Sequence, residues 1–377
     1  MTGAIDNDGE IALLRDSARE FASRKRDHKR TRALRHTLPG FDTKLADQIN
    51  ELGWPGILIP ETHGGFGLGF AGMRVVIEEL GRSLLAEPLV ATNVLSCRAL
   101  LHGDNAPLKN ELLPNIANGS LSAALAWQED NGGVDLETIK MTARRTGATL
   151  RLSGRKRFIA GGAGAHGFLV AARHDDDIGL FWLETANSRC QIAHEWRADG
   201  TPSTVLTLQD VEIPTEHVVA RSSAGIQRAI DEATIVASSE LLGIMRQLLE
   251  MTIEYMRTRV QYGRPIGSFQ ALQHRVVDLY VQQELSHAVV TDAIAALDQN
   301  VSASERGRLA SRTKARCSEA GLRISRDAVQ LHGAIGFTDE CDVGLYLKRA
   351  LTLSAWLGNA AVHRRRFLVM SHDANAA

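Results

Sequence analysis

The sequence predicts a mostly α-helical protein with a central β domain, and three observations support this fold class. Apolar residues recur at helical spacing in the first and last parts of the chain. The middle part consists of short β-rich runs separated by Gly, Asn and Asp turns. The length of 377 residues exceeds that of one usual domain. We therefore expect an N-terminal helical domain over 1–118, a β domain over 119–223 and a C-terminal helical domain over 224–377.

Three segments of the expected N-terminal domain have apolar residues at helical spacing. They read IALLRDSAREFA (11–22), TKLADQINELGW (43–54) and MRVVIEELGRSLL (73–85). The glycines of IPETHGGFGLG, residues 59–69, break this periodicity, so we expect a loop between the second and third helices.

The expected β domain is a series of short strands. The runs are SAALAW (122–127), TLRLSGRKRFIA (149–160), HGFLVAAR (166–173), IGLFWLE (178–184) and TPSTVLTLQDVEI (201–213). After them the sequence returns to long amphipathic helices, the first of which includes AIDEATIVASSELLGIMRQLLEMTIEYMRTRV, residues 229–260.

The most informative stretch is YMRTRVQYGRPIGSFQALQHR, residues 255–275. We expect a helix that ends at Gly263 with arginines on its last turn, followed by a tight Gly/Pro turn. The guanidinium of Arg259 offers fork-shaped donors to a pyrophosphate, and the amides of Gln261 and Gln270 can hydrogen-bond ribose or adenine. Arginines near a helix C-terminus also complement the helix dipole, so this stretch alone fits a solvated basic helix end equally well.

A second stretch, AVQLHGAIGFTDE, covers residues 328–340. It puts Gln330 at a helix end and follows it with Gly333 and Gly336, where the missing side chain lets a ligand or another backbone approach closely. Taken alone, the stretch is a helix C-cap and a loop.

In combination and in this order, the two stretches resemble the flavin-contacting segments of the acyl-CoA dehydrogenase family. The resemblance covers nearly the whole chain, because the α, β, α order is also that of the family. It implies an N-terminal helical domain, a middle β-barrel-like domain and a C-terminal four-helix bundle. It also implies FAD as the cofactor, held largely across a subunit boundary by these residues: Arg259, Gln261, Phe269, Gln270, Gln330 and Gly333.

The resemblance further implies α,β-dehydrogenation of an acyl-CoA thioester, with an electron-transfer flavoprotein as acceptor. In that reaction a carboxylate takes the α proton while the flavin accepts the β hydride. The two positions that carry the family's catalytic glutamate are Leu357 and Ala233 here, and neither side chain can take a proton. The base is therefore unknown. Glu240, which we expect to be buried among apolar residues, and Glu232, which would need a small register shift, are the candidates.

The part of the site that faces the flavin ring also departs from the family pattern. The family's hydroxyl-bearing positions read Gln128, Val134 and Ala160, and the position of an arginine near coenzyme A is Thr234. Only Gln128 could still hydrogen-bond the ring. The segments that in the family contact a neighbouring subunit's flavin thus keep the family's residues. The segments that in the family hold the subunit's own flavin and substrate have lost them.

This asymmetry predicts a helper subunit that completes the site of a catalytic partner. The resemblance extends to bacterial relatives, notably in steroid side-chain degradation, that assemble as α2β2 tetramers of two acyl-CoA dehydrogenase-like subunits. Three alternatives stay open: a self-sufficient homomer such as a homotetramer with Glu240, Glu232 or Glu129 as a displaced base, a flavin monooxygenase, and a non-catalytic assembly protein.

Composition argues against several other classes. The formal net charge is -1, from 43 basic and 44 acidic side chains, which gives no electrostatic footprint for nucleic acid. The four cysteines have neither the spacing of a metal site nor the density of a disulfide scaffold. The sequence has no apolar signal region and no membrane-length apolar run. We therefore expect a cytoplasmic protein that lacks a bound metal, a membrane span and a nucleic-acid partner.

Overall fold

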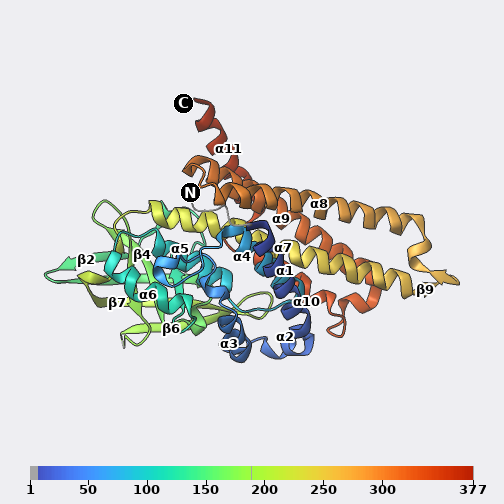
Figure 1. Cartoon of the computed structure of the whole chain (residues 1–377), viewed down its shortest axis with the longest axis horizontal. Coiled ribbons are helices and arrows are strands. Elements are labelled where there is room, and N and C mark those ends of the chain that lie inside the picture. Colours follow the sequence, from blue (N-terminus) through green and yellow to red (C-terminus); the bar gives the residue numbers. More distant parts are fainter. Residues whose placement is uncertain (1–6, 188, 377) are drawn as a thin grey trace. The chain divides into compact units, whose positions relative to one another are not determined.

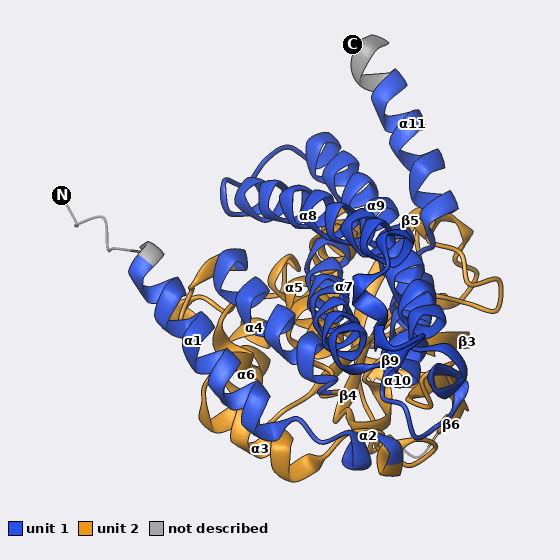
Figure 2. Cartoon of the chain, turned by 90° about the vertical axis from the view of Figure 1, so that its right-hand side faces the viewer, with its two compact units in different colours: residues 1–32, 70–85, 234–377 blue, residues 33–69, 86–233 orange. Residues whose placement is uncertain are grey.

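The computed structural model describes residues 7–187 and 189–376 (Figure 1). The chain forms two compact units (Figure 2). One, called the helical unit below, comprises the residues up to 32, 70–85 and 234–377; the other, called the sheet unit, comprises 33–69 and 86–233. The long helix α7 (Ala224–Thr258) begins in the sheet unit and continues in the helical unit. The three-domain division made from the sequence stays a prediction.

The three helices predicted near the N-terminus are confirmed as α1 (Asn7–Lys25), α3 (Thr43–Glu51) and α4 (Gly69–Ser83). The helical segments that the sequence analysis missed are α2 (His28–Leu34), the π-helix η3 (Val90–Ser96), α5 (Cys97–Leu101) and α6 (Ala106–Ala117). Helix α2 has no buried residue and therefore no apolar periodicity, and α6 contains an internal proline. The predicted loop lies between α3 and α4 and includes the short helix η2 (Glu61–His63).

The central part of the chain folds into an eight-stranded sheet. Its strands are β1 (Ala123–Ala126), β2 (Thr142–Thr146), β3 (Thr149–Ile159), β4 (Gly167–His174), β5 (Asp177–Glu184), β6 (Cys190–Trp196), β7 (Pro202–Pro214) and β8 (Val218–Ala220). The order is β6-β7-β3-β2-β4-β5-β8, with β1 paired to β4 in parallel.

The five predicted strands are present, and β2, β6 and β8 were missed. Residues of β2 and β6 are mostly exposed or half-buried, so these strands lack the apolar alternation that reveals a strand in a sequence. Strand β8 has only three residues. By contrast, every residue of β1 is buried, which explains its continuous apolar run.

The C-terminal part is helical again, as predicted. A two-stranded hairpin of β9 (Val260–Gln261) and β10 (Arg264–Pro265) follows α7, and then come α8 (Gln270–Asp298), α9 (Ala303–His332), α10 (Val343–Ala355) and α11 (Ala360–Ala376). Helix α9 packs against α8, α10 and α11 within the helical unit. Among the described residues, no helix is both long and apolar enough to cross a membrane.

Candidate functional site

The arginine-bearing corner is built differently from the sequence prediction. Helix α7 ends at Thr258 rather than at Gly263, because the chain then forms the hairpin of β9 and β10. Tyr262 and Gly263 adopt φ angles of 52° and 76°, the two left-handed conformations that a two-residue hairpin turn requires. Arg259 lies between helix and hairpin, where its amide donates to the carbonyl of Tyr255 at 2.8 Å.

The polar side chains of this corner face solvent. Arg259, Gln261 and Gln270 are exposed, and within the described chain their side chains form no hydrogen bond or ion pair. Phe269 is half-buried beneath Arg264, whose guanidinium carbon lies 4.2 Å from the ring centroid. An open set of guanidinium and amide donors with no acceptor among the described residues suits an anionic ligand supplied from outside.

The second stretch lies at the same end of the helical unit. Helix α9 ends at His332, two residues beyond Gln330, and Gly333 follows with a φ of 67°. The rings of Tyr255, near the end of α7, and His332 stack with centroids 4.4 Å apart. Exposed Gln330 is therefore brought toward the corner that carries Arg259, and a Cβ placed on Gly333 would meet no atom within 4 Å. The surface here is open to a ligand or another chain.

A groove of about 760 Å³ lies along α7 beside this stack. Its lining residues come from the second half of α7 and the end of α9: Gln247, Glu250, Met251, Ile253, Glu254, Tyr255, Arg257 and His332. The groove gives this end of the helical unit a concave surface as well as unpaired donors.

Leu357 lies in a tight turn between α10 and α11. It is 1% exposed, and its φ of 60° is in the left-handed region. The Nε2 atom of buried His363 donates to the carbonyl of Leu357 at 2.8 Å, and Lys314 donates to the carbonyl of Leu353. Burial lowers the pKa of His363 to about 4, against the opposing effect of this hydrogen bond. His363 thus fixes the turn, Lys314 fixes the end of α10, and the buried side chain in the turn is aliphatic.

Glu232 lies in a buried charge cluster. Its side chain is 1% exposed and accepts from Arg98 Nε at 2.7 Å, from His102 Nε2 at 3.0 Å and from Arg228 Nε at 2.9 Å. Burial alone would raise the pKa of Glu232, but the hydrogen bonds from His102 and Arg98 outweigh it and hold the pKa below its ordinary value. A general base that works near neutral pH needs the opposite shift.

Glu240 is buried at 7% exposure, as predicted. Its Oε1 atom accepts from Arg349 Nε of α10 at 2.7 Å, and its backbone packs against Gly81 of α4 so closely that a Cβ there would lie 2.5 Å from the Glu240 carbonyl. The carboxylate therefore links α7 to α10. Ala233, at the family's second glutamate position, is completely buried.

The residues that replace the family's hydroxyls do not compensate for them. The Gln128 amide donates to the carbonyls of Gly132 at 3.1 Å and Gly133 at 3.2 Å, so both of its N–H groups have acceptors within its own loop. Val134 and Ala160 have no hydrogen-bonding side chain.

Glu129 is likewise engaged in the sheet unit. It accepts from Lys156 Nζ at 3.0 Å and from the amide of Met141 at 2.9 Å. Burial favours the neutral form of Glu129, but Lys156 and the backbone donors outweigh burial and lower its pKa. Burial lowers the pKa of Lys156 to about 8 against the charge of Glu129. This pair fixes the loop that follows β1.

One surface feature escaped the sequence analysis. Helix α8 exposes a row of apolar side chains at spacings of three and four residues, called the α8 stripe: Val277 (57% exposed), Tyr280 (51%), Val281 (45%) and Leu285 (50%). Their helical spacing was readable in the sequence, but periodicity alone does not show whether an apolar face covers its own core or another chain.

Comparisons with known proteins agree with this geometry. The profile described as acyl-CoA dehydrogenase, C-terminal domain, matches residues 224–368, and the profile of the N-terminal domain matches residues 8–120. Because the two matches cover well over half of the chain, the chain belongs to the acyl-CoA dehydrogenase family. Members of this family are FAD-dependent flavoproteins.

Two curated relatives show the extent of the similarity. The acyl-CoA dehydrogenase IpdE2 of Mycolicibacterium smegmatis is 28% identical over 359 residues, which cover 95% of this chain and 97% of the relative. The mitochondrial isovaleryl-CoA dehydrogenase of Arabidopsis thaliana is 26% identical over 337 residues, or 86% of this chain and 81% of the relative.

Solved structures show the same fold. A chain of a variant of the Tcur3481-Tcur3483 steroid ACAD superposes with a TM-score of 0.90 at 28% identity, covering 98% of this chain and all of that one. A chain of the ChsE4-ChsE5 complex of Mycobacterium tuberculosis has a TM-score of 0.89 at 23% identity, with 98% of each chain covered. The predicted fold, including the helical N- and C-terminal parts around a central sheet, is confirmed.

Proposed function

We propose that this chain is the helper subunit of a heteromeric, FAD-dependent acyl-CoA dehydrogenase. The observation that carries the proposal is an asymmetry in hydrogen bonding. Arg259, Gln261 and Gln270 present donors that no described residue of the chain pairs with, whereas Gln128 on the sheet unit has its donors engaged within its own loop. Donors that face outward can bind the FAD of a neighbouring subunit. The Gln128 amide, whose N–H groups already bond its own loop, cannot donate to a flavin ring.

The residues at the end of the helical unit fit the non-reacting half of FAD. Arg259 would hold the pyrophosphate, because a guanidinium matches paired phosphate oxygens. Gln261, Gln270 and Gln330 would hydrogen-bond the ribose and adenine, and Gly333 would let them approach the backbone. FAD, when bound, supplies the hydride acceptor for α,β-dehydrogenation of an acyl-CoA thioester.

The proposal assigns the catalytic base to the partner. Leu357 and Ala233 cannot take a proton, and each acid considered as a displaced base is engaged elsewhere. Glu232 accepts from three cationic or imidazole donors, Glu240 is paired with Arg349, and Glu129 is paired with Lys156. A carboxylate stabilised in its charged form by such partners is a poor proton acceptor.

The α8 stripe supports assembly with another chain. Four apolar side chains in one helical row, each about half exposed, form a surface that a partner helix could bury. The name of one similar structure joins Tcur3481 and Tcur3483 in one steroid acyl-CoA dehydrogenase. By analogy we propose an α2β2 tetramer with a second acyl-CoA dehydrogenase-like subunit, and electron-transfer flavoprotein as its electron acceptor.

Expression of the chain alone and together with any acyl-CoA dehydrogenase homologue encoded by a neighbouring gene tests the proposal. The complex should contain FAD and dehydrogenate an acyl-CoA, whereas the lone chain should do neither. Full FAD content and turnover by the lone homomer would contradict the proposal. Rapid reoxidation of the reduced complex by air would favour a monooxygenase, and a colourless complex would favour an assembly protein.

Two variants of this chain sharpen the test. Arg259→Ala should lower the FAD content of the co-purified complex about tenfold or more, because a charge-assisted phosphate contact is lost. Arg365→Ala removes an exposed arginine of α11 instead and serves as the matched control. Equal FAD content in both complexes would mean that Arg259 does not hold the cofactor.

A further inference from the structure

The sheet unit contains a second cavity, remote in sequence from Arg259 and Gln330. Its volume is about 190 Å³, which corresponds to roughly six water molecules. It lies among α3, the π-helix η3, the end of α6 and the start of β1, and its polar lining side chains are Thr43, Asp47, Asn50, Glu87, Thr92, Asn93, Ser122 and His166. Apolar side chains such as Ile49, Leu89, Ile116 and Leu121 form the rest of the wall.

One wall of this cavity is the π-helix η3. Seven consecutive buried residues form this rare helix, and the Ser96 hydroxyl donates to the carbonyl of Ala91 at 2.8 Å. Such segments occur frequently at functional sites. Here η3 contributes both Thr92 and Asn93 to the lining.

Asn93 is a buried amide with unused donor capacity. Its side chain is 9% exposed, and its Oδ1 atom lies 2.7 Å from the Thr92 hydroxyl, whose one proton is also 2.9 Å from the carbonyl of Pro88. Its Nδ2 atom reaches one acceptor in the described chain, the carbonyl of Pro55, at the long distance of 3.5 Å. An amide nitrogen carries two N–H groups, so at least one of them is available to an acceptor inside the cavity.

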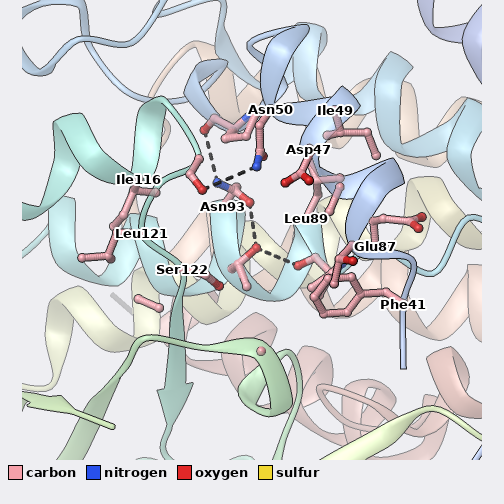
Figure 3. A pocket seen from close by; sticks show the side chains of 18 of the residues that line it. Phe41, Asp47, Ile49, Asn50, Glu87, Leu89, Asn93, Ile116, Leu121 and Ser122 are labelled. Carbon is pink, nitrogen blue, oxygen red and sulfur yellow. Dashed lines mark hydrogen bonds between the residues drawn. The ribbon is translucent and has the colours of Figure 1, made fainter. Parts of the chain in front are cut away.

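The charged groups of the lining all carry one sign. Asp47 and Glu87 supply carboxylates, and none of the described residues that line the cavity is Lys or Arg. In Figure 3, Asp47 and Asn50 of α3 and Asn93 of η3 face a common space. Within the described chain the exposed Asp47 carboxylate forms no ion pair or hydrogen bond. The field in this cavity therefore favours a cation at the side of Asp47.

We propose that this cavity binds a small organic ammonium that also carries a hydroxyl group. The ammonium would lie near the Asp47 carboxylate, the hydroxyl oxygen would accept from Asn93, and a branched apolar body would contact Ile49 and Leu89. The cavity residues are separate from those assigned to FAD, so ligand binding here can be tested independently of the helper-subunit function.

Calorimetric titration of the purified full chain with four probes of similar apolar body tests this chemistry. The probes are leucinol, isoamylamine, isoamyl alcohol and isovalerate. Leucinol should bind most tightly, isoamylamine next and isoamyl alcohol about tenfold more weakly than the amine, because one charge-assisted hydrogen bond is lost. Isovalerate should bind least, since its carboxylate meets that of Asp47.

Variants then locate the site. Asp47→Asn should weaken leucinol and isoamylamine binding about five- to tenfold and leave isoamyl alcohol unchanged. Asp176→Asn, which removes a carboxylate in the β4–β5 turn outside the cavity, is the matched control. Ala46→Phe adds a large ring to the cavity wall and should abolish binding of every probe.

Three results would overturn the proposal. The first is no binding of leucinol up to about 20 mM, a weakness beyond any specific site of this size. The second is equal affinity for isoamyl alcohol or isovalerate, which would exclude charge recognition. The third is binding that Asp47→Asn and Ala46→Phe leave intact, which would place the ligand elsewhere.

Discussion

Replacement of Glu232 by glutamine separates a structural role from a catalytic one. The substitution keeps the shape of the side chain but removes its negative charge. Arg98 and Arg228, which lie 2.7 and 2.9 Å from the Glu232 carboxylate, would then face a neutral amide. If Glu232 anchors the start of α7 to α5, the protein should lose stability. If Glu232 were the displaced base, it should lose activity instead.

The expected loss of stability follows from the burial of the cluster. Removal of one partner from a buried charged pair costs about 3–5 kcal/mol. The Arg98 and Arg228 side chains keep 15% and 33% of their exposure, so water compensates them in part and we expect about 2–4 kcal/mol. For a chain of 377 residues that loss corresponds to a fall in Tm of roughly 3–5 °C.

The pH dependence gives a second measure of the same anchor. The pKa of Glu232 lies below its ordinary value of 4.5 in the folded protein. Its contribution to stability is therefore complete at pH values above the unfolded pKa and is lost as the pH falls through the folded one. The difference in Tm between wild type and Glu232→Gln should shrink as the pH is lowered below about 4.5.

Calorimetry or circular dichroism at several pH values measures these differences, and FAD content and turnover of the co-purified complex report on function. Glu212→Gln is the matched control, because Glu212 is 42% exposed and pairs with Arg151 at the surface, where such pairs contribute about 0–1 kcal/mol. A Glu232→Gln protein that melts like the wild type but has lost more than about 99% of the turnover of the complex would refute the anchor argument.

Three further predictions concern other parts of the helical unit. Val281→Glu on the α8 stripe should prevent assembly with the partner in size-exclusion chromatography with light scattering, whereas Leu13→Glu at an exposed apolar site of α1 should not; assembly by both would exclude the stripe as an interface. Burial lowers the pKa of Lys314 from 10.5 to about 7. Between these two pH values Lys314 is protonated in the unfolded chain but largely neutral in the folded chain, so the stability should rise from about pH 7 to about pH 10.5. Lys314→Met should lack this rise in urea unfolding, and parallel pH profiles would contradict it. Leu357→Glu places a carboxylate at a 1% exposed site and should lower Tm by several degrees, more at pH 8 than at pH 5, because the neutral acid is easier to bury; a pH-independent Tm difference would count against burial of the new carboxylate.

Local patterns explain why much of the fold was predictable. The helix, strand and helix order was correct because periodicity of apolar residues depends only on neighbours in the sequence. Helix α2 and strand β2 escaped because they bury little and so carry no such pattern. The end of α7 was placed at Gly263 because the sequence does not reveal that Tyr262 takes a left-handed conformation in the hairpin turn.

For the candidate site too, some features could be predicted from the sequence and others required the folded structure. The amino-acid sequence alone supplied the residue types proposed to meet FAD, Arg259 and Gln330 among them, and the absence of a carboxylate at positions 357 and 233. The folded chain was needed to learn what the remaining acids do. Arg98 lies 134 residues from Glu232, and Arg349 lies 109 residues from Glu240. Ion pairs over such separations leave no local pattern, because they depend on which helices pack together in the folded chain.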